Sequence, residues 1–296
     1  MTIPILLETS ALISLSTPEL EKYVSECPEI TISPYTFWEL LYHLDEDWSK
    51  KKGQICKCSR VKILDDPRAV NEIDLQYRVE RLNNRVPDSR LIPKIIECLE
   101  KANSIDAFYN ISFFDEIGKM RLIKGCSKRV QEALDEKEDK YLAFVKKILD
   151  YFDQGGHNLD SDHDCHNAIM SLVEGAVITS QQNSIQMQMQ DMRNQVIEKY
   201  YLYFAYIFER TKKLLKNGCL QPERNDYEDG LICLHLHLNK PLIFVTKDKG
   251  LSDALINSLN RIKKLEFNLA LYPIVIYIQN KLNLTEIKNT ESSRRD

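Results

Sequence analysis

Residues 5–16 read ILLETSALISLS, and residues 242–256 read LIFVTKDKGLSDALI. Each stretch begins as a short apolar run, typical of a buried strand, and then changes to polar residues that favour the start of a helix. The first run reaches Glu8, and the second delivers Asp248 just past its end. Strands that lead directly into helices predict a parallel sheet covered by helices.

The same alternation of strands and helices continues outward from these two stretches. We expect strands at 3–7, 29–33, 241–246 and 271–278, and helices at 11–15, 18–27 with Thr17 as cap, 34–45, from Asp229 onward, and 251–259. From Trp48 to about Gly218, charged helical patterns replace the strands. The predicted organisation is a discontinuous α/β core (1–50 plus 219–287), a helical insertion of four to six helices (51–218) and a flexible polar tail (288–296).

Composition favours a soluble globular protein of the cytoplasm. The chain has 296 residues, 43% of them hydrophobic, and no apolar run approaches the ~20 residues that a membrane helix needs. The N-terminus has no signal-peptide pattern, so we expect no membrane association. Of the eight cysteines only Cys56 and Cys58 lie close together. Buried thiols are therefore expected, and neither a zinc ribbon nor a secreted disulfide scaffold is indicated.

Two further acidic residues complete a set of four. Glu39 lies in SPYTFWELLYHL (33–44), and Asp229 lies in NDYEDGLICLHLHL (225–238). If the elements form one parallel sheet, all four carboxylates gather at the carboxyl ends of its strands, where open α/β sheets place their sites. Clustered carboxylates repel one another unless a divalent cation lies among them. The pattern thus indicates metal-dependent phosphodiester chemistry.

The order of these motifs resembles that of the PIN-domain nucleases. The matching segments are LLETSALI, FWELL, EDGLICLHLHL and FVTKDKGL, and the resemblance covers about residues 1–50 and 220–285. It implies a PIN-like parallel α/β sheet of five strands flanked by helices, here with a mainly α-helical insertion. It also implies an acidic site that binds Mg²⁺ or Mn²⁺ and cuts RNA, sometimes DNA, with a metal-activated water.

Carried over position by position, the resemblance assigns a role to each matching residue. The implied catalytic and metal-binding carboxylates are Glu8, Glu39, Asp229 and Asp248, with Asp226 as a further implied metal ligand. Ser10 and Thr246 would orient ligands or contact phosphate, and Lys247 and Lys249 would attract the nucleic-acid backbone. Local basic residues matter because the net charge of −4 gives no overall attraction to RNA.

One departure from the family pattern leaves a second interpretation open. PIN-domain proteins nearly always carry Asp at the first position, where this chain has Glu8. The longer side chain could ligate a metal from a withdrawn backbone, or it could mark a catalytically weakened scaffold or nucleic-acid-binding protein. A third interpretation is a helical interaction protein in which the acids are coincidental. The insertion could also form a homo-oligomer interface or bind a protein partner.

A second group of potential metal ligands lies in GGHNLDSDHDCHNAI (155–169). It contains His157, Asp160, Asp162, His163, Asp164, Cys165 and His166. Such a density could bind zinc, but we favour a polar loop in which Asp160 or Asp162 caps the next helix. His235 and His237 are predicted to lie on a helix, partly buried and not as ligands.

Overall fold

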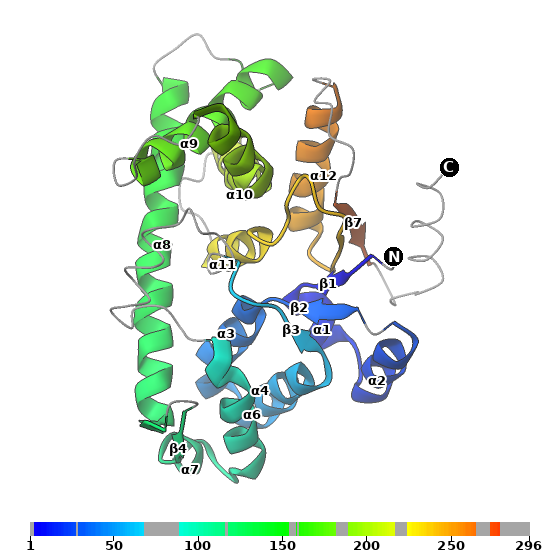
Figure 1. The fold of residues 1–296 in the computed structure, drawn as a ribbon, viewed down its shortest axis with the longest axis vertical. Helices are drawn as coiled ribbons and strands as arrows, with labels where there is room; N and C mark the ends of the chain where they lie inside the picture. Colours follow the sequence, from blue (N-terminus) through cyan, green and yellow to red (C-terminus); the bar gives the residue numbers. More distant parts are fainter. Residues whose placement is uncertain are drawn as a thin grey trace.

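A five-stranded parallel sheet lies at the centre of the fold (Figure 1). The computed structural model describes residues 3–27, 29–67, 89–115, 118–153, 158, 160–181, 189–216, 224–264 and 273–278. The strand order is β3-β2-β1-β6-β7, and every neighbouring pair is parallel. The strands are β1 (Ile5–Leu7), β2 (Ile30–Ile32), β3 (Lys62–Ile63), β6 (Ile243–Thr246) and β7 (Ile274–Tyr277). The predicted parallel α/β sheet of five strands flanked by helices is confirmed.

The central strand β1 is buried along its whole length. Its three apolar residues suit a parallel sheet that is covered on both faces. Leu7 pairs in register with Ile32 of β2 and with Val245 of β6, so these three strands end at the same edge. The chain extends the sheet in one direction through β2 and β3, and in the other through β6 and β7. The topological switch point therefore lies between β1 and β6, where such sheets bind their ligands.

Side-chain caps define where the helices beside the sheet begin. Ser16, rather than the predicted Thr17, caps α2, because its hydroxyl accepts from the Glu19 N–H while the Glu19 carboxylate accepts from the Ser16 N–H. Ser33 caps α3 by accepting from the Tyr35 N–H. The helices of this part are α1 (Thr9–Ser14), α2 (Thr17–Glu26), α3 (Pro34–Tyr42), α4 (Trp48–Cys56), α11 (Arg224–Cys233) and α12 (Lys249–Lys264).

The described residues between α4 and α11 are mainly helical. Its long helix α8 runs along one side of the molecule, with α9 and α10 packed beside it (Figure 1). Helix α10 also contacts α11 and α12, so it connects this segment to the sheet region. The helices are α6 (Ile92–Lys101), α7 (Ile105–Tyr109), α8 (Ile123–Asp153), α9 (Asp162–Gln181) and α10 (Met189–Lys216), with short 3₁₀ helices at Lys57–Arg60 and Ser89–Leu91. A further 3₁₀ helix, Leu44–Glu46, precedes α4.

Three short strands interrupt the range that was predicted to be helical. Strand β3 joins the edge of the parallel sheet beside β2. Its two residues are too few to produce a periodic signal in the sequence. The other two, β4 (Ser112–Phe114) and β5 (Met120–Leu122), form an antiparallel hairpin. Gly118 in the connecting segment has a φ of 74°, a conformation that favours glycine.

The hairpin has one buried and one exposed apolar face. Phe113 is buried, whereas Phe114 and Met120, which pair across the strands, are 65% and 66% exposed.

Among the described residues, no helix combines the length and the apolar character needed to cross a membrane. The predicted tail, 288–296, lies outside the described residues.

Truncation of the central strand should cost much more stability than truncation of a surface helix. Leu6 is fully buried in β1, so Leu6→Ala should lower the free energy of unfolding by about 2–5 kcal/mol. Leu142→Ala makes the same chemical change at an exposed position of α8 and should cost about 0.5 kcal/mol or less. Urea unfolding followed by circular dichroism measures both values. Equal losses in the two variants would contradict a sheet centred on β1.

Candidate active site

Glu8 lies at the switch point, directly after β1, and is only 3% exposed. It is the N-cap of α1, since its carboxylate accepts from the Ser10 N–H at 2.7 Å. The same carboxylate accepts hydrogen bonds from the Ser10 and Thr246 hydroxyls, the latter at 2.9 Å. Burial raises the pKa of Glu8 and repulsion from Asp248 adds to this, while the hydrogen bonds from Ser10 and Thr246 oppose it.

The residues after β6 are tied to the end of β1 by hydrogen bonds. The Lys247 N–H donates to the Ser10 hydroxyl at 3.0 Å, and the Asp248 N–H donates to Thr246 Oγ1 at 2.9 Å. Asp248 precedes α12 and accepts from the Leu251 N–H at 2.7 Å, so it caps that helix. Lys249 is exposed in the first turn of α12. Ser10 and Thr246 therefore hold the first and last predicted carboxylates at one edge of the sheet.

Glu39 projects from α3 toward the start of α1. Its carboxylate accepts from the Thr9 hydroxyl at 2.6 Å. Burial, followed by repulsion from Glu228 and Glu8, raises the pKa of Glu39 to about 8, while Thr9 and Lys51 act in the opposite direction. Glu39 and Glu8 are thus close enough to disfavour each other's ionisation.

Asp229 faces the other three carboxylates from α11. It lies inside this helix, which begins at Arg224, and not at its start as predicted. Its carboxylate accepts from the Tyr206 hydroxyl at 3.3 Å. Burial raises the pKa of Asp229 well above its usual value, and repulsion from Glu8, Glu39 and Asp248 raises it further. The four predicted carboxylates therefore lie close enough together to repel one another.

Asp226 lies one turn before Asp229 and has a different partner. It is 1% exposed and accepts from the guanidinium of Arg210 on α10 in a buried ion pair. In the sequence, Arg210 is simply one of several basic residues close together, with Lys212, Lys213 and Lys216. No local signal could reveal its pairing, because it depends on how α10 packs against α11. The same guanidinium opposes the rise in the Asp229 pKa.

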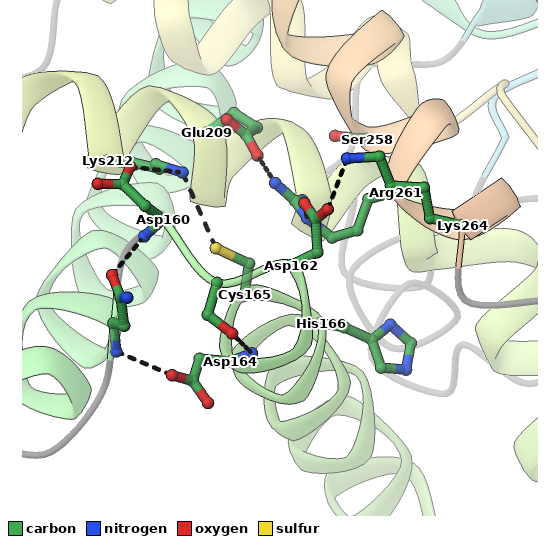
Figure 2. A network of polar contacts seen from close by, with 12 residues as sticks. Asp160, Asp162, Asp164, Cys165, His166, Glu209, Lys212, Ser258, Arg261 and Lys264 are labelled. Atoms are coloured by element: carbon green, nitrogen blue, oxygen red, sulfur yellow. Dashed lines mark hydrogen bonds and ion pairs between the residues drawn. The ribbon is translucent and has the colours of Figure 1, made fainter.

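The aspartates at the start of α9 bind cationic side chains (Figure 2). Asp160 pairs with Lys216 of α10 at 2.7 Å, and Asp162 pairs with Lys264 of α12 at 2.8 Å. Ser161, rather than either aspartate, caps the helix by accepting from the Asp164 N–H. These contacts join α9 to α10 and α12. They are the polar helix start that we favoured over a zinc site.

The histidines and the cysteine of this cluster also have partners of their own. His166 Nδ1 lies 3.0 Å from the Tyr201 hydroxyl, and His163 Nδ1 lies 3.1 Å from the Asn167 amide nitrogen. Cys165 is buried, with its sulfur 3.9 Å from the Lys212 ammonium. His157 lies outside the described residues. Within the described part of the chain, no three His, Cys, Asp or Glu side chains are arranged to hold a metal ion, at this cluster or at the sheet edge.

His235 and His237 do not lie on a helix, contrary to the prediction, because α11 ends at Cys233. His235 Nε2 lies 2.9 Å from the hydroxyl of Ser33, the cap of α3. Burial lowers the pKa of His235 to about 3 and that of His237 to about 4. Both rings are therefore neutral at physiological pH, and His235 supports the start of the helix that carries Glu39.

Comparison of the chain with protein families, with curated proteins and with solved structures finds no match.

The raised pKa of Glu39 predicts that stability falls as pH rises. The folded protein holds the Glu39 proton more tightly than the unfolded chain, in which the pKa is 4.5. This contribution is fully present below about pH 4.5 and is lost as pH rises through about 8. Glu39→Gln should therefore flatten the decrease in the free energy of unfolding between about pH 5 and 8.5, measured by urea titration in the presence of EDTA.

Part of the decrease in the free energy of unfolding should persist in Glu39→Gln, because the pKa values of Glu8 and Asp229 are also raised. Glu132→Gln, at an exposed position of α8, is the matched control and should behave like the natural protein. An unchanged pH dependence in Glu39→Gln would show that Glu39 is not protonated in the folded state.

Proposed function

We propose that this protein is a metal-dependent nuclease of the PIN-like type that hydrolyses RNA. The observation that carries the proposal is the gathering of Glu8, Glu39, Asp229 and Asp248 from four elements at the switch point of a parallel sheet. Their mutual repulsion, together with the burial of Glu8 and the partial burial of Glu39 and Asp229, favours a bound cation. The resemblance of the four motifs to PIN domains, in the same chain order, supports the same activity.

The donor chemistry of the site fits Mg²⁺ or Mn²⁺. Both ions take oxygen ligands, and the four carboxylates, with Asp226 if it leaves Arg210, would hold them. When bound, the ion supplies an activated water and offsets the negative charge that develops on the phosphate. Ser10 and Thr246 orient Glu8 through their hydroxyls. Lys247 and Lys249, on either side of Asp248, attract the RNA backbone toward this edge.

A catalytically weakened PIN-like scaffold, or a nucleic-acid-binding protein, is the second candidate. The observation that favours it is the full engagement of Glu8, whose two oxygens accept hydrogen bonds from Ser10 and Thr246. The absence of a three-ligand arrangement among the described side chains points the same way. In either case a protein partner or second copy could use the exposed hairpin face of Phe114, Met120 and Leu122.

Asp229→Asn should abolish metal-dependent RNA cleavage without unfolding the protein. The Asn oxygen can still accept from Tyr206. Because Asn is neutral without taking up a proton, the thermal midpoint of the metal-free protein should rise at pH values at which Asp229 would ionise. Cleavage of a labelled single-stranded RNA should fall at least about 100-fold, beyond the roughly 10–100-fold expected for a group that only supports a ligand. Asp253→Asn, which removes an exposed charge from α12, is the matched control. Undiminished cleavage in Asp229→Asn would exclude this residue as a ligand.

A comparison of RNA cleavage with Mg²⁺ and with Mn²⁺ tests whether Glu8 is a metal ligand. Mg²⁺ requires near-ideal octahedral geometry at about 2.0–2.1 Å, so a ligand that is one methylene longer should disturb it more than Mn²⁺. We expect Mn²⁺ to support several-fold more cleavage than Mg²⁺, and Glu8→Gln to be inactive with both ions while its amide oxygen still caps α1. RNA binding without cleavage in either metal would instead favour the scaffold.

A further inference from the structure

We infer that Arg210 is a built-in cation of the acidic site, which competes with a divalent ion for the same carboxylates. This inference rests on the proposed function, because it concerns the regulation of the same site. It explains why carboxylates that are otherwise suited to a metal are not arranged around one in this structure. One of them is already neutralised by the guanidinium.

Two successive residues of α10 hold the two helices that carry part of the site. Glu209 accepts from Arg261 of α12, whose side chain is almost fully buried. Arg210 donates to Asp226 of α11. Adjacent positions on a helix point about 100° apart, so α10 contacts α12 on one side and α11 on another. Since Asp248 caps α12 and Asp229 lies on α11, Arg210 projects between the elements that hold these two carboxylates.

Gly250 gives an independent sign of where the guanidinium lies. A Cβ built on Gly250 would lie 2.7 Å from Arg210 Nη1 and 3.2 Å from Asp248 Oδ1. The arginine therefore reaches past Asp226 to the start of α12, beside the Asp248 carboxylate. The backbone of Gly250 does not have the positive φ that favours glycine. Glycine is a poor helix former, so its presence in α12 needs another reason. Any side chain at this position would occupy the space of the guanidinium.

Because of this position, Arg210 competes with a divalent ion for the carboxylates of the site. A guanidinium stays charged at all relevant pH values and binds carboxylates strongly through its planar donors. Here it is paired with Asp226, lies next to Asp248 and acts electrostatically on Asp229. A divalent ion entering the site meets this positive charge and must displace it to recruit Asp226. Metal binding should consequently be weaker than the carboxylates alone would allow.

Two variants of the protein test this by Mn²⁺ titration calorimetry, without any assay of cleavage. Arg210→Gln removes the positive charge, and we expect Mn²⁺ to bind on the order of tenfold more tightly. This is the effect of removing the repulsion between a unit charge and a divalent ion about 5 Å apart in a water-like medium. Gly250→Ala keeps every charge but pushes the flexible end of Arg210 away from Asp248. It should tighten binding by a smaller factor, about two- to fivefold.

Each variant has a matched control. Lys213→Gln removes a positive charge from an exposed position of the same helix, and Gly53→Ala adds a methyl group to α4 where nothing lies within 4 Å. Both should bind Mn²⁺ within about twofold of the natural protein. If Arg210→Gln unfolds because Asp226 loses its buried partner, Gly250→Ala still decides, since alanine in place of a helical glycine favours folding.

A second measurement is the rise in the thermal midpoint that Mn²⁺ produces, which reports binding to the folded state. It should be larger in Arg210→Gln than in the natural protein. Weaker or unchanged Mn²⁺ binding in both variants would overturn the inference, and so would an absence of Mn²⁺ binding in Arg210→Gln.

The proposed function is tested separately. If the natural protein cleaves RNA with Mn²⁺ while the variants bind Mn²⁺ no more tightly, the proposed nuclease activity is supported and the competition by Arg210 is not. If Arg210→Gln binds Mn²⁺ but no protein cleaves RNA, the competition stands and the nuclease does not.

Discussion

The pairing of β1 with β2 on one side and β6 on the other is the constraint on which the site depends. The common register ends the strands together, so the carboxylate that follows β1 and the one that follows β6 share an edge. Thr246 fixes this relation by donating its hydroxyl hydrogen to Glu8. Glu8 and Asp248 each cap a helix, where a negative charge is stabilised by the helix dipole. The edge of the sheet therefore positions Glu8 and Asp248. It also places each of them at a helix start, where a negative charge is stabilised.

The other two carboxylates depend on helix packing. Glu39 and Asp229 belong to α3 and α11, which contact each other, and both are partly buried close to acids of like charge. Such an arrangement opposes ionisation, and protons, hydrogen bonds from Thr9 and Tyr206, and one guanidinium together reduce the repulsion. Helix α10 supplies that guanidinium. The mainly helical segment is thus part of the electrostatic balance of the site, beyond any role as a surface for partners.

Short-range signals explain which features could be predicted from the sequence. The runs of β1, β2, β6 and β7 are visible because they are almost entirely apolar, with Thr31 and Thr246 as the exceptions. Such near-continuous apolar runs are typical of strands in a parallel sheet that is covered on both faces. The rule that sites lie past strand ends then located Glu8 and Asp248. Strand β3 escaped prediction because two residues give no pattern, and the Arg210–Asp226 pair because it arises only when α10 meets α11. The group around His163 was interpreted correctly as a polar helix start, but the partners of its aspartates could not be predicted because they come from α10 and α12.

The two neighbours of β1 become available at very different times when the chain is synthesised. Glu8 and Thr246 are 238 positions apart, while the partner strand β2 follows within a few tens of residues. At about 5–20 residues per second, β1 would wait roughly 10–50 s for β6 after its own synthesis. During that interval one edge of an apolar strand has no partner, which is a template for wrong pairing. Helices that depend on local contacts form in the meantime, so this topology exposes the nascent protein to aggregation mainly through its central strand.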